Sequence, residues 1–285
     1  MNFTDPAIIS ALSVVTSIVT TILIKPWIDH HFYQRKLNIE FQYEQRKKIK
    51  EVLAKYKVPL IKVCNEVNER YWNFQENYSK GWLNAEGNFD QSGYYFKSFV
   101  YRILAVFAWI KIIEGELIFL DTTIASKKDL ELLKYFRLIK DVFTSVQLYK
   151  TFNYDQSSAS DHIFRNQLED MSEAFMQDGK VITSSEFNKN FSSILPAIKP
   201  FCAFLDNINP EINKLRWDRF HLFHIALIGF VNSYGYDFQQ VDKNTILKIN
   251  ARLGKNGLLE NFQEHINYFK LNGNKELILI MNTLR

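Results

Sequence analysis

Three side chains that could bind a metal ion or transfer protons recur on one predicted helix near the carboxyl end: Asp218, His221 and His224. Neighbouring members lie three residues apart, so Asp218 with His221, or His221 with His224, could reach one metal ion. The full set drifts around the helix, and no Glu stands beside a His pair at four-residue spacing, as it does in zinc hydrolases. The pattern is more typical of histidines that cap the polar edges of a packed helix.

A second candidate pair is Asp161 with His162, which would act together with the first group only if the fold brought the two groups together. The sequence contains no glycine-rich phosphate loop and no Gly-x-Ser-x-Gly nucleophile motif. Cys64 and Cys202 fit no metal or redox spacing, so we expect both to be reduced, buried thiols. No cofactor is predicted, and the sequence does not identify a metal site.

Carboxylates near the end of a predicted core helix form a third candidate group. Glu114 and Glu116, together with Asp121, could form an acidic site. Carboxylates on adjacent turns are more often solvated or paired with lysines, and we expect Lys111 and Lys127 to be those partners.

The rest of the chain is organised around residues 7–24, an uncharged run between Asp5 and Lys25. As a helix it covers roughly 27 Å, close to the roughly 30 Å hydrocarbon core of a bilayer. A signal peptide would need basic residues before the run and a small-residue cleavage site after it, and neither is present. A buried core helix would seldom keep so long an uncharged run at the end of a chain. We therefore predict one membrane span.

The residues that follow this run predict its orientation. Lys25, Arg35 and Lys36 are basic, whereas only Asp5 and the amino group lie before the run. By the positive-inside rule the amino terminus lies outside and the body lies in the cytoplasm, which predicts an inner-membrane protein. Trp27 adds the aromatic residue expected at the interface between membrane and water.

Hydroxyl side chains form one stripe along the predicted span: Ser10, Ser13, Ser17 and Thr20. Small residues let helices approach closely, so the stripe predicts self-association into a homo-oligomer. Each hydroxyl could instead bond back to its own helix, in which case the stripe has no such role. The sequence leaves these two alternatives open.

Apolar residues recur with helical periodicity throughout the chain, which predicts an all-α fold. We expect an amino-terminal transmembrane helix over 1–27, a juxtamembrane helix over 28–78 that is kinked near Pro59, and a cytosolic multi-helix domain over 79–285. Part of the juxtamembrane helix packs with that domain. With 47% hydrophobic and 15% aromatic residues, the body has ample material for a core.

The pattern also predicts where individual helices of the body lie. Residues 94–120 and 210–234 are the strongest core helices, because apolar residues cover nearly their whole circumference. Residues 161–176 are predicted to be helical with a serine-led start. Pro196, Pro200 and Pro210 are expected to break up the segment between them.

Three stretches resemble a group of bacterial proteins: Arg70 to Asn73, the aromatic-rich segment 94–114, and Asp161 with His162. The resemblance covers most of the chain. It implies a membrane-anchored protein with a helical cytosolic body, and it carries no assigned activity. No functional residue is transferred from it.

These observations favour a membrane-anchored interaction or effector protein, and not an enzyme, whose helical body senses a protein partner or ligand. A membrane-tethered metal-dependent hydrolase that uses the Asp218 region and a passive localisation scaffold are the alternatives. The net charge of +4 and the pI near 8.8 are too mild to indicate nucleic-acid binding.

Overall fold

A computed structural model describes residues 6–152, 154, 161–212, 214–250 and 257–284. The chain divides into two compact units, Met1–Glu51 with Leu120–Ala125, and Val52–Phe119 with Ser126–Arg285. The structure is 79% helical, with one small two-stranded sheet. The prediction of an all-α helical bundle is therefore confirmed.

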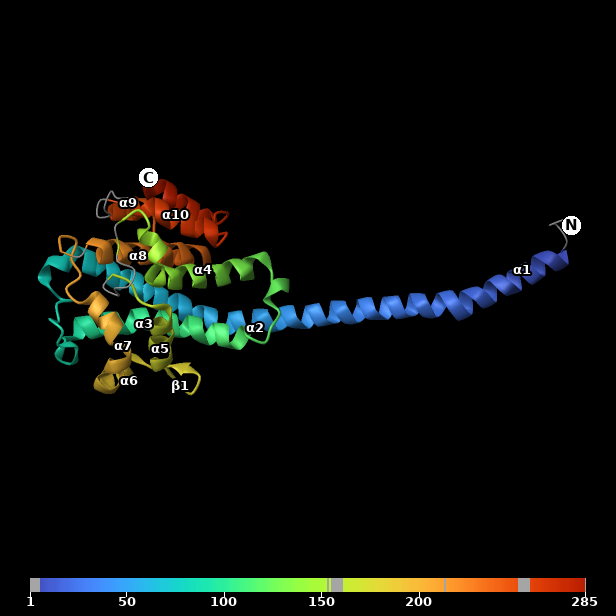
Figure 1. Ribbon diagram of the computed structural model, residues 1–285, viewed down its shortest axis with the longest axis horizontal. Helices are drawn as coiled ribbons and strands as arrows, with labels where there is room; N and C mark the ends of the chain where they lie inside the picture. The colour runs from blue at the N-terminus through green and yellow to red at the C-terminus, as the bar shows by residue number, and fades with distance from the viewer. Residues whose placement is uncertain (1–5, 153, 155–160, 213, 251–256, 285) are drawn as a thin grey trace. The chain divides into compact units, whose positions relative to one another are not determined.

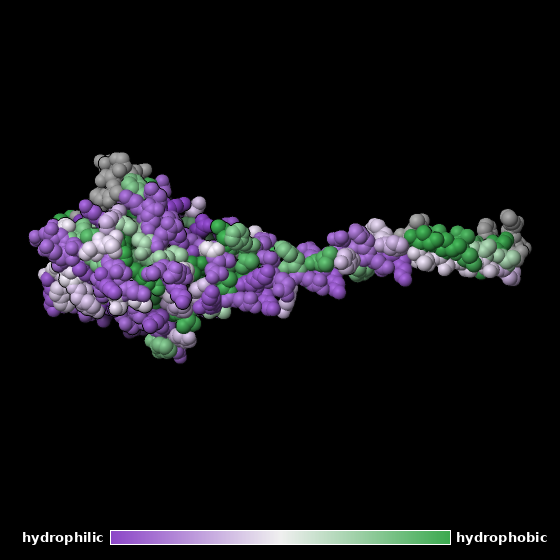
Figure 2. All heavy atoms as spheres, turned by 90° about the horizontal axis from the view of Figure 1, so that it is seen from below, coloured by the Kyte–Doolittle hydropathy of each residue, from purple (hydrophilic) through white to green (hydrophobic). Residues whose placement is uncertain are grey.

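The first unit contains the uncharged segment. Helix α1 (Pro6–Val19) passes through a π-helical turn, η1 (Thr20–Ile24), into α2 (Lys25–Asn77). No residue of α1 is buried. Figure 2 shows apolar surface gathered on this segment and a more polar surface where α2 begins. Among the described helices, this continuous stretch is the one long and apolar enough to cross a membrane.

A short piece of chain completes the first unit. Residues Thr122–Ile124 form the 3-10 turn η4, whose start is capped by the Asp121 carboxylate. Arg46 Nε of α2 donates a hydrogen bond to the Ile124 carbonyl oxygen at 2.8 Å. Asp121 thus serves a local turn.

The core of the second unit contains α3 (Tyr94–Leu117) and α8 (Lys214–Tyr234) (Figure 1). Every side chain of α8 from Trp217 to Asn232 is buried. A helix that is apolar around most of its circumference is stable only when other elements surround it. Helices α4 (Lys127–Thr144), α10 (Leu258–Tyr268) and α11 (Lys275–Leu284) all contact α8.

The remaining elements of this unit cover the two core helices. Helix α5 (Arg165–Ala174) packs on α3 and on α7 (Phe191–Leu205). The others are α6 (Ser184–Lys189), α9 (Lys243–Asn250), the 3-10 turns η2 (Tyr78–Lys80), η3 (Phe89–Gln91), η5 (Val146–Tyr149) and η6 (Asp237–Gln239), and strands β1 (Met176–Gln177) and β2 (Lys180–Val181). The two strands pair antiparallel, with Met176 opposite Val181.

Polar side chains fix where several helices begin. Thr183 and Glu186 form a reciprocal capping box at the start of α6, and Ser126 caps α4. Asp206 accepts hydrogen bonds from the backbone N–H groups of residues 85, 86 and 87, which fastens the loop before α3 to the end of α7.

Two sequence predictions about individual helices are wrong. Pro196 and Pro200 lie inside α7 and do not break it, because its buried face, including Phe201, packs into the core. Pro59 lies inside α2, which continues undivided past it, and the predicted kink there stays a prediction. Helix α5 begins at Arg165 and not at residue 161. The Gln167 side-chain oxygen accepts a hydrogen bond from the Phe164 backbone N–H at its start.

Gly229 is required by close packing, and we expect Gly229→Ala to lower the free energy of unfolding by about 1–3 kcal/mol. An added Cβ would lie 2.7 Å from Cδ2 of Leu277, which is fully buried and has little room to move. Gly115→Ala is the matched control, because a Cβ at that helical glycine meets no atom within 4 Å. Alanine there should stabilise by up to about 1 kcal/mol. Equal thermal stability of the two variants would contradict this packing.

Candidate functional site

Asp218, His221 and His224 lie on α8 and are fully buried, and the two histidines contact α2. The ring of Tyr71 on α2 stacks on His224, with centroids 4.1 Å apart, and meets His221 edge-on at 5.5 Å. This aromatic interface holds both histidines inside the core.

The contacts between α2 and α8 also set the direction of the two helices. Tyr71 meets His224, whereas Phe74 meets Phe220 and Trp217. Rising residue numbers on α2 therefore face falling numbers on α8, so the helices run antiparallel.

His221 makes a hydrogen bond within its own helix. Its Nδ1 lies 2.9 Å from the Trp217 carbonyl oxygen. Because a carbonyl can only accept, Nδ1 carries the proton. The ring also packs against Trp217, with centroids 4.6 Å apart. A histidine fixed in this way serves packing inside the core.

His224 is the most unusual polar group of the interface. Neither of its ring nitrogens has a hydrogen-bond partner among the described residues. Burial, and then the neighbouring His221, hold the pKa of His224 well below its ordinary value of 6.5. The ring is therefore neutral in the folded protein, packed between Tyr71 and the edge of Trp72.

The arrangement does not favour a metal centre at these residues. Asp218 Oδ1 lies 4.0 Å from Lys214 Nζ, one turn earlier on α8. Within the described part of the chain, no three His, Cys, Asp or Glu side chains converge as metal ligands. The complete Asp218, His221 and His224 set therefore does not form a three-ligand site.

Asp161 and His162 make their contacts elsewhere. Asp161 Oδ1 lies 3.7 Å from Arg216 Nε, and His162 Nδ1 lies 2.5 Å from the Tyr154 hydroxyl. Burial, and then the charge of Arg219, lower the pKa of His162. Asp161 and His162 thus contact Arg216 and Tyr154, whereas His221 and His224 pack on Tyr71. These contacts do not bring the two candidate groups together.

The acidic candidates form ion pairs with partners that the sequence did not indicate. Glu114 pairs with Lys140 at 2.6 Å. Glu116 accepts a hydrogen bond from the Tyr56 hydroxyl at 2.6 Å and pairs with Lys55 at 3.5 Å. Lys111, expected beside these two, instead pairs with carboxylates of α5. Glu114 and Glu116 therefore belong to ion pairs between helices and not to one acidic site.

Arg219 is a buried charge that the sequence prediction missed. Its guanidinium stacks over the Tyr149 ring at 4.3 Å and donates hydrogen bonds to the Tyr149 hydroxyl and to the Val142 and Ser145 carbonyls. Burial, opposed by Arg219, raises the pKa of Tyr149 to about 12. The position of an arginine in the middle of an apolar helix was the sequence signal that could have indicated a buried charge. Its role here is to tie η5 to α8.

A carboxylate–imidazole pair of the kind found in acid–base sites was also missed by the sequence prediction. His265 Nδ1 lies 2.5 Å from Asp141 Oδ2, and Arg165 lies 3.8 Å from the other carboxylate oxygen. The two partners are separated by 124 residues, so no sequence spacing could predict the pair. It joins α4 to α10, which accounts for it structurally.

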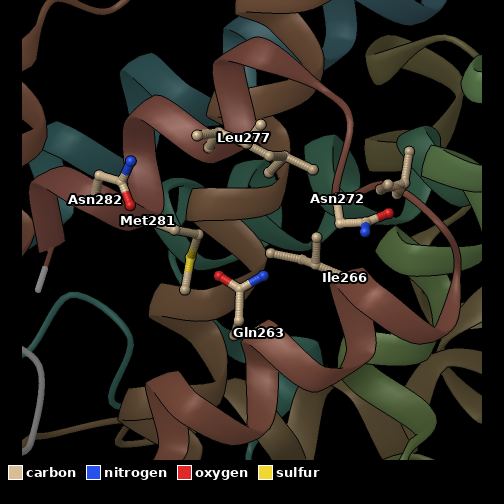
Figure 3. Close-up of a pocket in the computed structure, with 8 residues that line it drawn as sticks. Gln263, Ile266, Asn272, Leu277, Met281 and Asn282 are labelled. Carbon is tan, nitrogen blue, oxygen red and sulfur yellow. The ribbon is translucent and has the colours of Figure 1, made fainter.

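A small cavity of about 70 Å³ lies between α10 and α11. Figure 3 shows the side chains that line it. Its lining includes three apolar side chains and three amides: Ile266, Leu277, Met281, Gln263, Asn272 and Asn282. None of the histidines or carboxylates predicted as site residues lines this cavity.

Comparison of the chain with protein-family models, curated proteins and solved structures finds no match.

The lowered pKa of His224 gives the protein a specific acid sensitivity. Because the unfolded chain, with a pKa near 6.5, protonates first, stability should fall by about 1.4 kcal/mol per pH unit below that value. His224→Phe retains an aromatic ring beside Tyr71 and should remove this loss. Urea unfolding of both proteins at pH 7.5 and about one unit below pH 6.5 measures the difference. An identical pH dependence in both would show that His224 is already protonated or solvated in the folded state.

Proposed function

We propose that the protein is a single-pass membrane-anchored interaction protein whose body lies in the cytoplasm. The observation that carries the proposal is the exposure of the uncharged segment. Val15 is 58% exposed, Ile18 50% and Ile22 64%. Burial of one such aliphatic side chain is worth about 1.5–3 kcal/mol, so a whole exposed helix of them requires a cover. A bilayer supplies that cover along the full length of the segment.

The body is proposed to act by binding a partner or ligand. Its candidate acid–base residues His221 and His224 are buried among aromatic rings, which supports packing over hydrolysis. Tyr236 and Phe238 instead form a stacked pair that is 52% and 81% exposed. Exposed paired aromatics suit protein recognition. A body that only localises another protein remains the scaffold alternative.

Self-association through the span is part of this proposal. The hydroxyls of Ser13 and Thr20 donate to backbone carbonyls of their own helix, at 2.8 Å each. Because these hydroxyl groups already donate within their own helix, hydrogen bonds between spans add little to the proposed self-association. The proposal depends instead on the close approach that small side chains allow. Two chains confined to one membrane meet at high effective concentration, so modest contacts suffice.

Alkaline carbonate extraction tests the anchor directly. The full chain should stay in the membrane pellet, whereas Val14→Lys with Ile18→Lys should move it to the supernatant, because each charge costs about 2.5–3.5 kcal/mol near the centre of a span. Leu37→Lys with Ile39→Lys is the control, with the same charges added to exposed positions of α2. Extraction of the unaltered chain would refute the anchor. Crosslinking in the same membranes should detect oligomers, and monomers alone would refute self-association.

A further inference from the structure

A surface cluster of cations and aromatic rings joins α2 to the start of α3. Arg70 Cζ lies 4.7 Å from the centroid of the Tyr95 ring and 5.8 Å from that of Tyr94. Trp82 packs against Tyr95 at 4.6 Å, and Lys80 Nζ lies 4.9 Å over Trp82. The two tyrosine rings limit where the Arg70 guanidinium can move, so its position is restricted before any ligand arrives.

Two guanidinium groups of this surface converge on one neutral oxygen. Arg70 Nη2 lies 3.2 Å from Ser98 Oγ, and Arg102 Nη1 donates to the same oxygen and, at 3.2 Å, to the Ser98 carbonyl. Ser98 is only 5% exposed, so the shared oxygen is fixed in the fold. Like charges this close repel each other unless an anion lies between them.

The nearby carboxylates do not neutralise this pair. Glu66 Oε2 lies 3.9 Å from Arg102 Nε and shares its charge with Lys62 at 4.0 Å. In the described ranges of the chain, no carboxylate lies within ion-pair distance of Arg70. Arg102 and Lys62 thus share one carboxylate and Arg70 pairs with none in those ranges, which leaves net positive charge around Ser98.

Tyr94 belongs to the same cluster, and the lowered pKa of its phenol reflects the positive potential there. Its side chain is 68% exposed, so it faces solvent beside the two arginines. A hydrogen bond with Ser98, and then the charges of Arg102 and Arg70, lower the pKa of the phenol. The backbone N–H groups at the start of α3, where no acidic residue lies in the first turn, add to the same potential.

We propose that Arg70, Arg102, Ser98 and Tyr94 form a binding site for a phosphate-class oxyanion. A tetrahedral dianion can accept from both guanidinium groups at once and neutralise both, which a single carboxylate does less well. The Tyr94 hydroxyl supplies a further donor, since the Ser98 hydroxyl donates to Tyr94. The phosphate could belong to a soluble ester or to a lipid headgroup, which share this chemistry. The site is independent of the proposed membrane span.

Calorimetric titration of the full chain in neutral detergent at low salt tests the site. The probes are inorganic phosphate and monodisperse dioctanoyl phosphatidic acid. We expect saturable binding of at least one probe and about tenfold or greater weakening in Arg70→Gln, which removes one charge-assisted fork. Arg165→Gln, which removes an equally charged and 78% exposed guanidinium, is the control and should bind as the unaltered chain does. Near-ultraviolet circular dichroism checks that each variant is folded.

Binding of both probes would support a soluble phosphate ester, and Arg70-dependent binding of the lipid alone would support a headgroup. Three results would overturn the site. These are no saturable binding of either probe, unchanged affinity in Arg70→Gln, or equal weakening in Arg70→Gln and Arg165→Gln. None of these results depends on membrane integration, so failure of the site and failure of the anchor are distinguishable.

Discussion

The antiparallel packing of α2 on α8 is the contact on which the body depends. Tyr71 stacks on His224, and Phe74 packs among Phe99, Trp217 and Phe220. Helix α8 is buried around its circumference, and α4, α10 and α11 pack against it in turn. Because α2 follows the uncharged segment without a break in the helix, the element that completes the core is also covalently continuous with the proposed anchor.

Buried polar groups in this core differ in whether they have hydrogen-bond partners. Arg219 is buried, yet carbonyls, a hydroxyl and an aromatic face surround it. Asn68 and His224 are also buried, and their side-chain polar atoms have no hydrogen-bond partner among the described residues. An unsatisfied buried polar group costs about 1–3 kcal/mol. Aromatic and aliphatic packing along α2 and α8 must therefore offset this loss.

The sequence predicted the helices whose apolar residues recur with clear periodicity, and failed where distant contacts decide the structure. Residues 94–120 and 210–234 contain α3 and α8, but Pro196 and Pro200 are accommodated because α7 is held by its buried face. The spacing of Asp218, His221 and His224 placed them on one helix without indicating that Tyr71 covers the two histidines. Arg70 meets Tyr94 and Ser98 only through the packing of α2 on α3, which no local pattern encodes.

Hydrogen–deuterium exchange of the full chain in its native membrane is the most direct test of the account. We expect the slowest exchange in α8 and protection of residues 7–24 that is lost when lipid is replaced by aqueous buffer. Exchange over 28–48 should be faster. Exchange over 7–24 as fast in the membrane as over 28–48, or early exchange of α8, would contradict an anchored body built around the α2 and α8 contact.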